Sequence, residues 1–577
     1  MMRSTSFAFV LFAACSTASH HANVTETSKP LTAFNQASPG TAADVARNVT
    51  SDRIANARRE PQNWLTYYGT YDGQRYSTLD HINATNVKDL KVAWVFQSGP
   101  TTLMPAHATY AFEATPIVVD GVMYVSGWNG FVWALDAKDG TLLWEYQHAI
   151  PLDAPLCCGN VNRGVAVAKG KVIYTTPDAH VIALDAQSGK VVWDEVFADI
   201  RAGESATAAP LIVKNLAIVG SSGGEYGVRG HLDAYEIDSG RRVWRHYTIP
   251  APGEAGSETW GTNDTWTRGG GTTWITGTYD PELNLLYWGT GNPGPDFRAD
   301  QRPGKNLFTN SVIALDPDTG AQRWYYQWTP ADVWDYDGVG ENILFDRDGR
   351  KLLAHADKNG YLFIIDRTNG QFVRATKFTE ATWGDIQERT GAVTPKLFPT
   401  EAGTVIAPGP SGGKEGFPHG AYSPQTGLLY VPVMPNRATY KTTPAEFREG
   451  LPWWGGDVDT ASHAHTGVLK AFDPSTGREA WSWTARYPMA GSLLATAGNL
   501  IVSGEPDGHV DAWNATTGEL LWRFQTGSGI HSSPVTYSID GKQYIAVPSG
   551  WGGWVAGIAP HMASAPRGDA LYVFALP

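Results

Sequence analysis

A nine-residue pattern that recurs along the chain limits the folds open to it more than any other feature. An acidic residue or Asn is followed four residues later by Gly and eight residues later by Trp. The complete copies begin at Asp136, Asp185, Glu236, Asp316, Asp473 and Asn514. A degenerate copy starts at Asp366 and has Arg374 in place of Trp, and Leu90–Trp94 matches the end of one more copy. Repeats of this length are typical of proteins built from stacked units.

Each copy of the pattern reads as a turn between two strands. Alternating apolar segments such as Val122–Val125 and Leu216–Val219 precede the turn, and a second strand ends on Trp. The spacings of 49, 51, 80, 50, 107 and 41 residues suit four-stranded antiparallel sheets, two of them with insertions. A single sheet of this kind cannot cover both of its faces, so the sheets must stack around an axis. The sequence therefore predicts an all-β, eight-bladed β-propeller whose recurrent Trp docks between neighbouring blades.

We expect this propeller to span residues 61–577, after an export signal at 1–20 and a polar leader at 21–60. The signal has Arg3, the apolar segment Phe7–Ala14 and small residues after it. Its apolar segment and Cys15 also resemble a bacterial lipoprotein box, with Phe12 an imperfect fit, and lipidation of Cys15 would anchor the protein to a membrane. The signal predicts a periplasmic protein.

Composition narrows the classes of function. No apolar run reaches the roughly 18 residues of a membrane span, and 42% hydrophobic residues exclude a disordered chain. The formal net charge of −13 argues against a nucleic-acid binder and suits pairing with a basic protein.

The chain has three cysteines, Cys15, Cys157 and Cys158, and neither a CxxC nor a CxxCH motif. A zinc ribbon and covalently bound c-type haem are therefore disfavoured. Adjacent cysteines can stay free, pair with other chains or pair with each other. Their Cα atoms lie about 3.8 Å apart, less than the usual disulfide span, so a mutual bridge would close a tight ring of the kind that marks functional sites. An oxidising compartment favours that bridge.

Five further segments do not belong to the repeat: Phe112–Pro116, Cys157–Gly164, Gly289–Pro293, Trp334–Gly338 and Asp540–Val547. Through these segments the chain resembles the pyrroloquinoline quinone (PQQ)-dependent alcohol dehydrogenases, which are eight-bladed propellers. The resemblance covers roughly residues 60–577, and it implies a dehydrogenase that binds PQQ and a metal ion.

PQQ is a planar ortho-quinone with three carboxylates, so it needs cations, hydrogen-bond donors and two flat walls. Arg163 and Lys358 match the cationic positions of the family. The resemblance implies further contacts from Glu113, Cys157, Cys158, Thr207, Ser222, Gly223, Gly224, Thr272, Trp274 and Trp554. Without the resemblance, the basic residues would be read as surface salt bridges and Trp274 as a core residue.

Glu225, Asn292 and Asp335 match the metal ligands of the family, and all three offer the oxygen donors that a hard cation requires. Asp337 follows two residues after Asp335, where an Asp marks the lanthanide-using members. Three carboxylates suit a trivalent ion better than a divalent one, so we expect one lanthanide ion, with Ca²⁺ as the alternative. Read alone, Asn292 is a turn residue and Asp337 a solvent-facing acid.

The resemblance implies a mechanism for the oxidation of small primary alcohols to aldehydes. Asp335 accepts the hydroxyl proton, the metal acts as Lewis acid, and Lys358 supports the developing oxyanion while hydride passes to PQQ. Because the chain carries no CxxCH, we expect the electrons to leave to a separate soluble cytochrome c.

Three positions depart from the family pattern. Met434 stands where an Asn often contacts PQQ, Met489 replaces a Trp, and the loop Gly412–Phe417 lacks a frequent Trp. The substrate pocket is therefore expected to be atypical. A related quinoprotein for sugars or polyols and a non-catalytic propeller scaffold are the alternative functions, and a homodimer is a family-level expectation only.

Overall fold

The computed structural model describes residues 49–98, 111–460, 462–463, 466–553 and 568–577, which all fall in one compact unit, Gly40–Pro577. The predicted export signal, Cys15, Trp554 and most of the predicted leader lie outside these residues. The last leader residues carry α2 (Ser51–Ala55), whose first turn is capped by the Thr50 hydroxyl, and the short 3-10 helix η1 (Ala57–Arg59).

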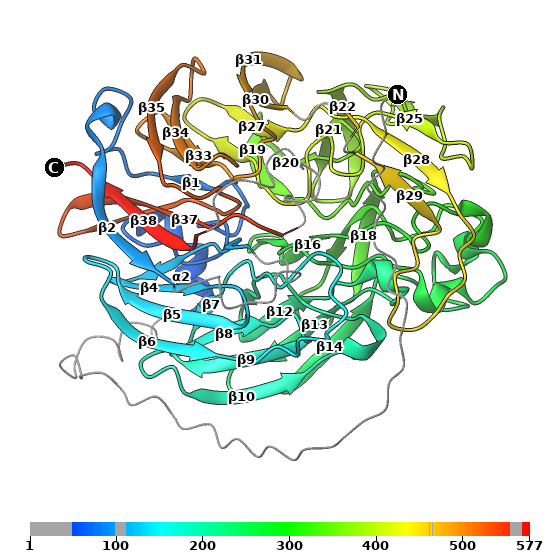
Figure 1. Cartoon of the computed structure of the whole chain (residues 1–577), viewed down its shortest axis with the longest axis horizontal. Helices are drawn as coiled ribbons and strands as arrows, with labels where there is room; N and C mark the ends of the chain where they lie inside the picture. The colour runs from blue at the N-terminus through cyan, green and yellow to red at the C-terminus, as the bar shows by residue number, and fades with distance from the viewer. Residues whose placement is uncertain (1–48, 99–110, 461, 464–465, 554–567) are drawn as a thin grey trace, which may run out of the picture. The chain divides into compact units, whose positions relative to one another are not determined.

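The described residues form eight sheets of four or five strands and two smaller ones. Five of the eight sheets use strands that follow one another in the chain. In Figure 1 they follow one another from the lower left along the bottom to the right and then to the top. The first sheet contains β3 (Ile117–Val119), β4 (Val122–Ser126), β5 (Phe131–Asp136) and β6 (Leu142–Gln147). The second contains β7 (Ala166–Ala168), β8 (Lys171–Thr175), β9 (His180–Asp185) and β10 (Val191–Val196). The third contains β11 (Leu211–Val213), β12 (Leu216–Gly220), β13 (His231–Glu236) and β14 (Arg242–Tyr247). The next two contain β15 (Thr278–Asp280), β16 (Leu285–Gly289), β17 (Ser311–Leu315) and β18 (Gln322–Gln327); β19 (Ile343–Arg347), β20 (Arg350–Ala356), β21 (Tyr361–Asp366) and β22 (Gln371–Lys377).

The other three large sheets combine strands from separate parts of the chain. Their members are β26 (Ala421–Ser423), β27 (Leu428–Val433), β30 (Gly467–Asp473) and β31 (Arg478–Ala485); β1 (Tyr76–Ser77), β32 (Leu494–Thr496), β33 (Leu500–Gly504), β34 (His509–Asn514) and β35 (Leu520–Gln525); β2 (Lys91–Gln97), β38 (Ala570–Ala575), β37 (Lys542–Ser549) and β36 (Val535–Ile539). In the last of these, β2 pairs antiparallel with β38, so strands from the two ends of the described chain share one sheet (Figure 1). The prediction that Leu90–Trp94 ends a further repeat is confirmed by this pairing.

A register shift lies beside the repeat Trp in seven of these eight sheets. In the first sheet Trp144 pairs with Ala134, whereas Leu142 pairs with Leu135, so Leu143 bulges out. The same shift occurs beside Arg374 in the degenerate copy. A bulge turns the strand and re-aims its side chains, and a small residue opposite Trp144 leaves room for the indole.

The re-aimed Trp side chains dock on the turn of the next repeat. A Cβ atom at Gly189, where φ is +68°, would lie 2.7 Å from Cε3 of Trp144, so only Gly fits beneath the ring. The Trp144 indole N–H donates to the Ala186 carbonyl at 2.9 Å in the same turn. Trp193, Trp244 and Trp481 donate in the same way to Ile237, Pro317 and Ala515. The predicted docking role of the repeat Trp is therefore confirmed in these copies.

Insertions interrupt the repeat at the two long spacings. The longer one carries the small sheets, with β23 (Gly384–Ile386), β24 (Val393–Pro395), β25 (Thr404–Ile406), β28 (Ala438–Thr442) and β29 (Gly456–Asp459). Short 3-10 helices occupy other loops: η2 (Val87–Asp89), η4 (Ile200–Ala202), η5 (Gly224–Tyr226), η6 (Ser257–Trp260), η7 (Thr265–Arg268) and η8 (Ala299–Gln301). Over the described ranges, no helix combines the length and apolar character that crossing a membrane requires.

Candidate functional site

A buried ion pair forms one end of the site. The Arg163 guanidinium lies 2.9 Å from the Glu113 carboxylate and donates to the Thr207 hydroxyl at 2.5 Å. His531 lies 3.2 Å from the other Glu113 oxygen. Burial raises the pKa of Glu113, but Arg163 and His531 outweigh it, so the pKa lies below its ordinary value. Glu113 is therefore ionised beside Arg163.

Two aromatic side chains flank the same guanidinium. Arg163 Cζ lies 5.0 Å from the ring centre of Trp274 and 5.4 Å from that of Phe417. Both distances are within the range of a cation–π contact. Trp274, predicted as a wall of the cofactor site, thus belongs to the same cluster as the predicted cation.

A short polar segment leads from this ion pair to a group of carboxylates. The Thr207 and Ser222 hydroxyls are 3.3 Å apart, and Ser222 begins the run Ser222–Glu225. The η5 turn, which begins at Gly224, places Glu225 at its centre. The Thr272 hydroxyl lies 3.2 Å from the position of a Cβ at Gly224. The predicted polar contacts Thr207, Ser222, Gly223, Gly224 and Thr272 therefore lie in one continuous strip.

Carboxylates from two loops meet at Lys358. The Lys358 ammonium lies 3.2 Å from Asp337, 3.5 Å from Glu415 and 3.8 Å from Asp335. Asp337 also accepts the Asn292 backbone N–H at 3.0 Å. A Cβ atom at Gly291 would lie 2.6 Å from that Asp337 oxygen, so the loop before Asn292 requires Gly for this close approach.

The carboxylates of this group repel one another. Burial and the neighbouring Asp337 raise the pKa of Glu225 to about 7. Burial, opposed by Lys358 and assisted by Asp337, raises the pKa of Asp335 well above its ordinary value. Burial would lower the pKa of Lys358, but Asp335 and Asp337 raise it above its ordinary value. Such a surplus of oxygen ligands and negative charge fits a hard cation.

Asp296 and Glu415 belong to this group although the family pattern did not single them out. Burial is the largest cause that raises the pKa of Asp296 well above its ordinary value, and the charges of Glu225 and Asp337 raise it further. One Asp296 carboxylate oxygen is buried without a hydrogen-bond partner among the described residues. Its place four residues after Asn292 was the signal that could have found it. The orphaned oxygen is a further donor for a cation in this cluster.

Cys157 and Cys158 are joined by a disulfide, so the predicted pairing is confirmed. Their Cα atoms are 3.8 Å apart. The two sulfur atoms and a Glu225 carboxylate oxygen all lie within 4.8 Å of one another. The disulfide therefore borders the carboxylate group that is predicted to hold the metal.

The positions that depart from the family pattern are buried. The Met434 N–H donates to the Gly413 carbonyl at 2.8 Å, and the Asn436 side chain accepts the Gly409 N–H at 3.0 Å. Asn436 thus supports the loop that leads to Glu415. Met489 is buried against Gly467, where a Cβ atom would lie 2.9 Å from its side chain.

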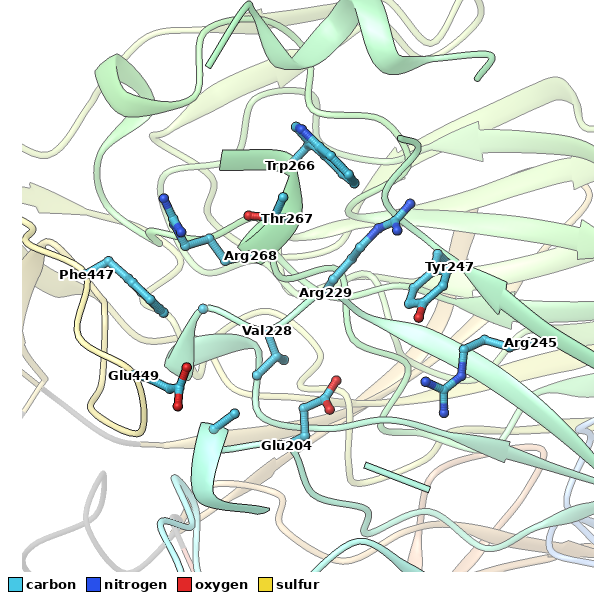
Figure 2. A pocket seen from close by; sticks show the side chains of 12 residues that line it. Glu204, Val228, Arg229, Arg245, Tyr247, Trp266, Thr267, Arg268, Phe447 and Glu449 are labelled. Atoms are coloured by element: carbon cyan, nitrogen blue, oxygen red, sulfur yellow. The ribbon is translucent and has the colours of Figure 1, made fainter. Parts of the chain in front are cut away.

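A cavity of about 490 Å³ lies beside the loop that follows Glu225. Its lining includes Val228 and Phe447, and Figure 2 shows Arg229 between Trp266 and Tyr247. Arg229 Cζ is 4.1 Å from the ring centre of Tyr247 and 4.9 Å from that of Trp266. None of the residues predicted to bind cofactor or metal is part of this lining.

These sheets and this site match a family model described as the glucose/ethanol/alcohol dehydrogenase β-propeller domain of PQQ proteins, over residues 64–388 and 484–545. The chain is thus an all-β propeller of the PQQ class. A quinoprotein alcohol dehydrogenase, PedH of Pseudomonas putida, is 38% identical over 566 residues, 92% of this chain and 93% of the relative. The chain belongs to the family of PQQ-dependent quinoprotein alcohol dehydrogenases.

Other relatives extend this likeness. A lanthanide-dependent methanol dehydrogenase of Methylacidiphilum fumariolicum is 37% identical over 590 residues, 91% of this chain and 94% of the relative. The structure of a europium-containing methanol dehydrogenase has a TM-score of 0.84 at 35% identity, covering 91% of this chain and 100% of that chain. The structure of quinohemoprotein alcohol dehydrogenase from Comamonas testosteroni has a TM-score of 0.84 at 36% identity, covering 93% of this chain and 83% of that chain.

Proposed function

We propose that the protein oxidises primary alcohols to aldehydes with PQQ and one lanthanide ion. The observation that carries this proposal is the convergence of Asp335, Asp337 and Glu415 on Lys358, next to Glu225 and the disulfide. A scaffold protein has no use for so many buried carboxylates, because each one costs free energy unless a cation compensates it.

PQQ would be held at the two cationic positions. Arg163 offers a guanidinium that is already aligned by Glu113 and Thr207, and Lys358 lies at the other end of the polar strip. The aromatic ring of Trp274 and the Cys157–Cys158 disulfide are the proposed flat walls. When bound, PQQ supplies the quinone that takes up two electrons, and the metal ion supplies Lewis acidity.

Asp335 is the proposed base because its pKa is raised and its side chain is more exposed than that of Asp337. Its side chain is 25% exposed, against 7% for Asp337. Its raised pKa makes it a better proton acceptor than an ordinary carboxylate. Asp335 would take the hydroxyl proton of the alcohol. Lys358, 3.8 Å from Asp335, would stabilise the oxyanion that develops in the reaction.

Glu225, Asn292, Asp335 and Asp337 are the proposed metal ligands, with Asp296 as an additional donor. Burial is the largest cause of the raised pKa values of Glu225, Asp296 and Asp335, and repulsion from neighbouring carboxylates adds to it although Lys358 lies beside Asp335. A trivalent ion offsets this repulsion better than Ca²⁺, which remains the alternative ion. The names of two relatives, both lanthanide-dependent methanol dehydrogenases, support the same choice.

The proposed assembly is an eight-bladed propeller over residues 61–577, supported by the eight large sheets. The segments 1–20 and 21–60 are the proposed signal and leader of a periplasmic protein. The net charge of −13 suits a basic soluble cytochrome c as electron acceptor, and a homodimer remains the family-level expectation.

The test is turnover by the purified protein with PQQ, ethanol and an artificial electron acceptor, with either La³⁺ or Ca²⁺ added. We expect activity with La³⁺ to exceed activity with Ca²⁺. Higher activity with Ca²⁺ would overturn the choice of ion. Activity on polyols or sugars but not on alcohols would favour the related quinoprotein, and no activity with any substrate or ion would favour the scaffold.

A further inference from the structure

Two histidines and an aspartate converge at the boundary between the β3–β6 sheet and the β7–β10 sheet. His148 follows β6, Asp178 lies in the turn before β9, and His180 begins β9. One ligand atom from each residue lies within 4.8 Å of the other two. His148 Nε2 is 2.9 Å and His180 Nε2 is 4.0 Å from the same Asp178 oxygen, Oδ2. These residues are separate from those proposed for PQQ and its metal.

Neighbouring groups orient two of the three side chains. His180 Nδ1 lies 2.7 Å from the Asp194 carboxylate, and a ring that donates from Nδ1 keeps the lone pair of Nε2 free. The Thr176 hydroxyl donates to Asp178 Oδ1 at 2.6 Å, which leaves Oδ2 for another partner. A histidine held by a carboxylate in this way is the common arrangement around metal-binding imidazoles.

Solvent reaches the side chains of the two histidines. The side chains of His148, Asp178 and His180 are 16%, 7% and 23% exposed. The two imidazole rings are 4.6 Å apart between centres and tilted by 50°. The site is therefore half-buried, and solvent can supply the remaining ligands.

We propose that His148, Asp178 and His180 bind a divalent transition-metal ion of the Zn²⁺ class. Two imidazoles and one carboxylate suit Zn²⁺, Co²⁺ or Ni²⁺, whereas Ca²⁺ and lanthanides require mainly oxygen. Bond lengths of about 2.0–2.1 Å in a tetrahedron separate neighbouring ligand atoms by roughly 3.3 Å. The separations of 2.9 and 4.0 Å from Asp178 Oδ2 bracket that value, and all three ligand atoms lie within 4.8 Å of one another, so small side-chain rotations would complete the site.

Such an ion would join two neighbouring sheets and fix the start of the loop that carries the disulfide. His148 begins residues 148–162, which lead to Cys157, Cys158 and then Arg163. The far end of this loop is already held, because the Asn129 N–H donates to the Asn160 side chain at 3.0 Å. The expected effect of the ion is therefore on stability, and it does not depend on the proposed catalytic function.

The experiment titrates Zn²⁺ into tag-free full-length protein preloaded with PQQ and La³⁺, using isothermal calorimetry and thermal unfolding. We expect one Zn²⁺ per chain in the wild type and a higher unfolding temperature. His148→Gln and His180→Gln should both abolish this binding. The matched control is His509→Gln. His509 lies 2.9 Å from the Asp507 carboxylate, and its side chain is about as exposed as that of His180, but no second histidine belongs to this pair.

Asp194→Asn tests the orienting role of the carboxylate. We expect its Zn²⁺ affinity to fall by roughly 10–100-fold with little change in the unfolding temperature of the metal-free protein. A crystal of the wild type soaked in Zn²⁺ should show an anomalous peak between His148, Asp178 and His180, and this result does not require any variant to fold. Equal Zn²⁺ binding by wild type and His148→Gln, or no peak, would overturn the proposal and reduce the cluster to an ion pair.

Discussion

Lys358→Met removes the ammonium on which three buried carboxylates converge. With an effective dielectric constant of about 20, ion pairs at 3.2, 3.5 and 3.8 Å correspond to about 5.2, 4.7 and 4.4 kcal/mol of direct attraction. Most of this attraction is offset by the desolvation of the lysine. The net loss expected for a broken buried pair is about 3–5 kcal/mol.

The size of the chain sets the expected change in unfolding temperature. An unfolding entropy of about 2.1 cal/mol/K per residue gives roughly 1.2 kcal/mol/K for 577 residues. In the absence of multivalent ions, Lys358→Met should therefore unfold about 3 °C below the wild type. La³⁺ should raise the unfolding temperature of this variant more than that of the wild type, because the ion replaces the missing positive charge.

Differential scanning calorimetry of chelator-treated protein, with and without La³⁺, measures both quantities. Lys414→Met is the matched control, since Lys414 is equally buried but pairs with Glu341, outside the proposed metal ligands. We expect this control to lose stability without the extra gain from La³⁺. Equal gains in the two variants, or an unchanged unfolding temperature for Lys358→Met, would refute the reasoning.

Three further predictions concern catalysis, docking and pH. Asp335→Asn should lower kcat at least about 100-fold with little change in PQQ affinity in a spectroscopic titration; near-normal turnover would exclude Asp335 as the base. Gly189→Ala should lower the free energy of unfolding more than Gly121→Ala does, as measured by denaturant unfolding. Both glycines have positive φ, but only Gly189 contacts a Trp ring, so equal losses of stability in the two variants would contradict the docking role. Burial raises the pKa of Asp569 to about 7, so the folded protein holds a proton that the unfolded chain releases. The free energy of unfolding should therefore fall as the pH rises from about 4 to about 7. Asp569→Asn should make this pH dependence weaker in denaturant unfolding curves, whereas an unaltered pH dependence would count against the buried acid.

The sheets of the fold follow from local sequence. The pattern of acid, Gly and Trp specifies a turn and its flanking strands within nine residues, and the structure has a sheet at each copy. Even the degenerate copy could be recognised from Asp366 and Gly370, and the structure shows the same register shift beside Arg374. The disulfide was equally local, since Cys157 and Cys158 are neighbours in the chain.

Sequence alone did not identify Asp296 or Glu415, and it left open how Trp274 contacts Arg163. These side chains meet groups that are far away in the chain: Glu415 reaches Lys358 across 57 residues. No nearby pattern signals such a meeting.

What the sequence determined by itself is therefore the repeating unit and the types of residue that interrupt it. Only the tertiary structure decided which carboxylates share a cation and which histidines face one aspartate. The physical reason is range: turns and strands depend on neighbours along the chain, whereas a charged site depends on distances of a few ångströms between loops that packing brings together.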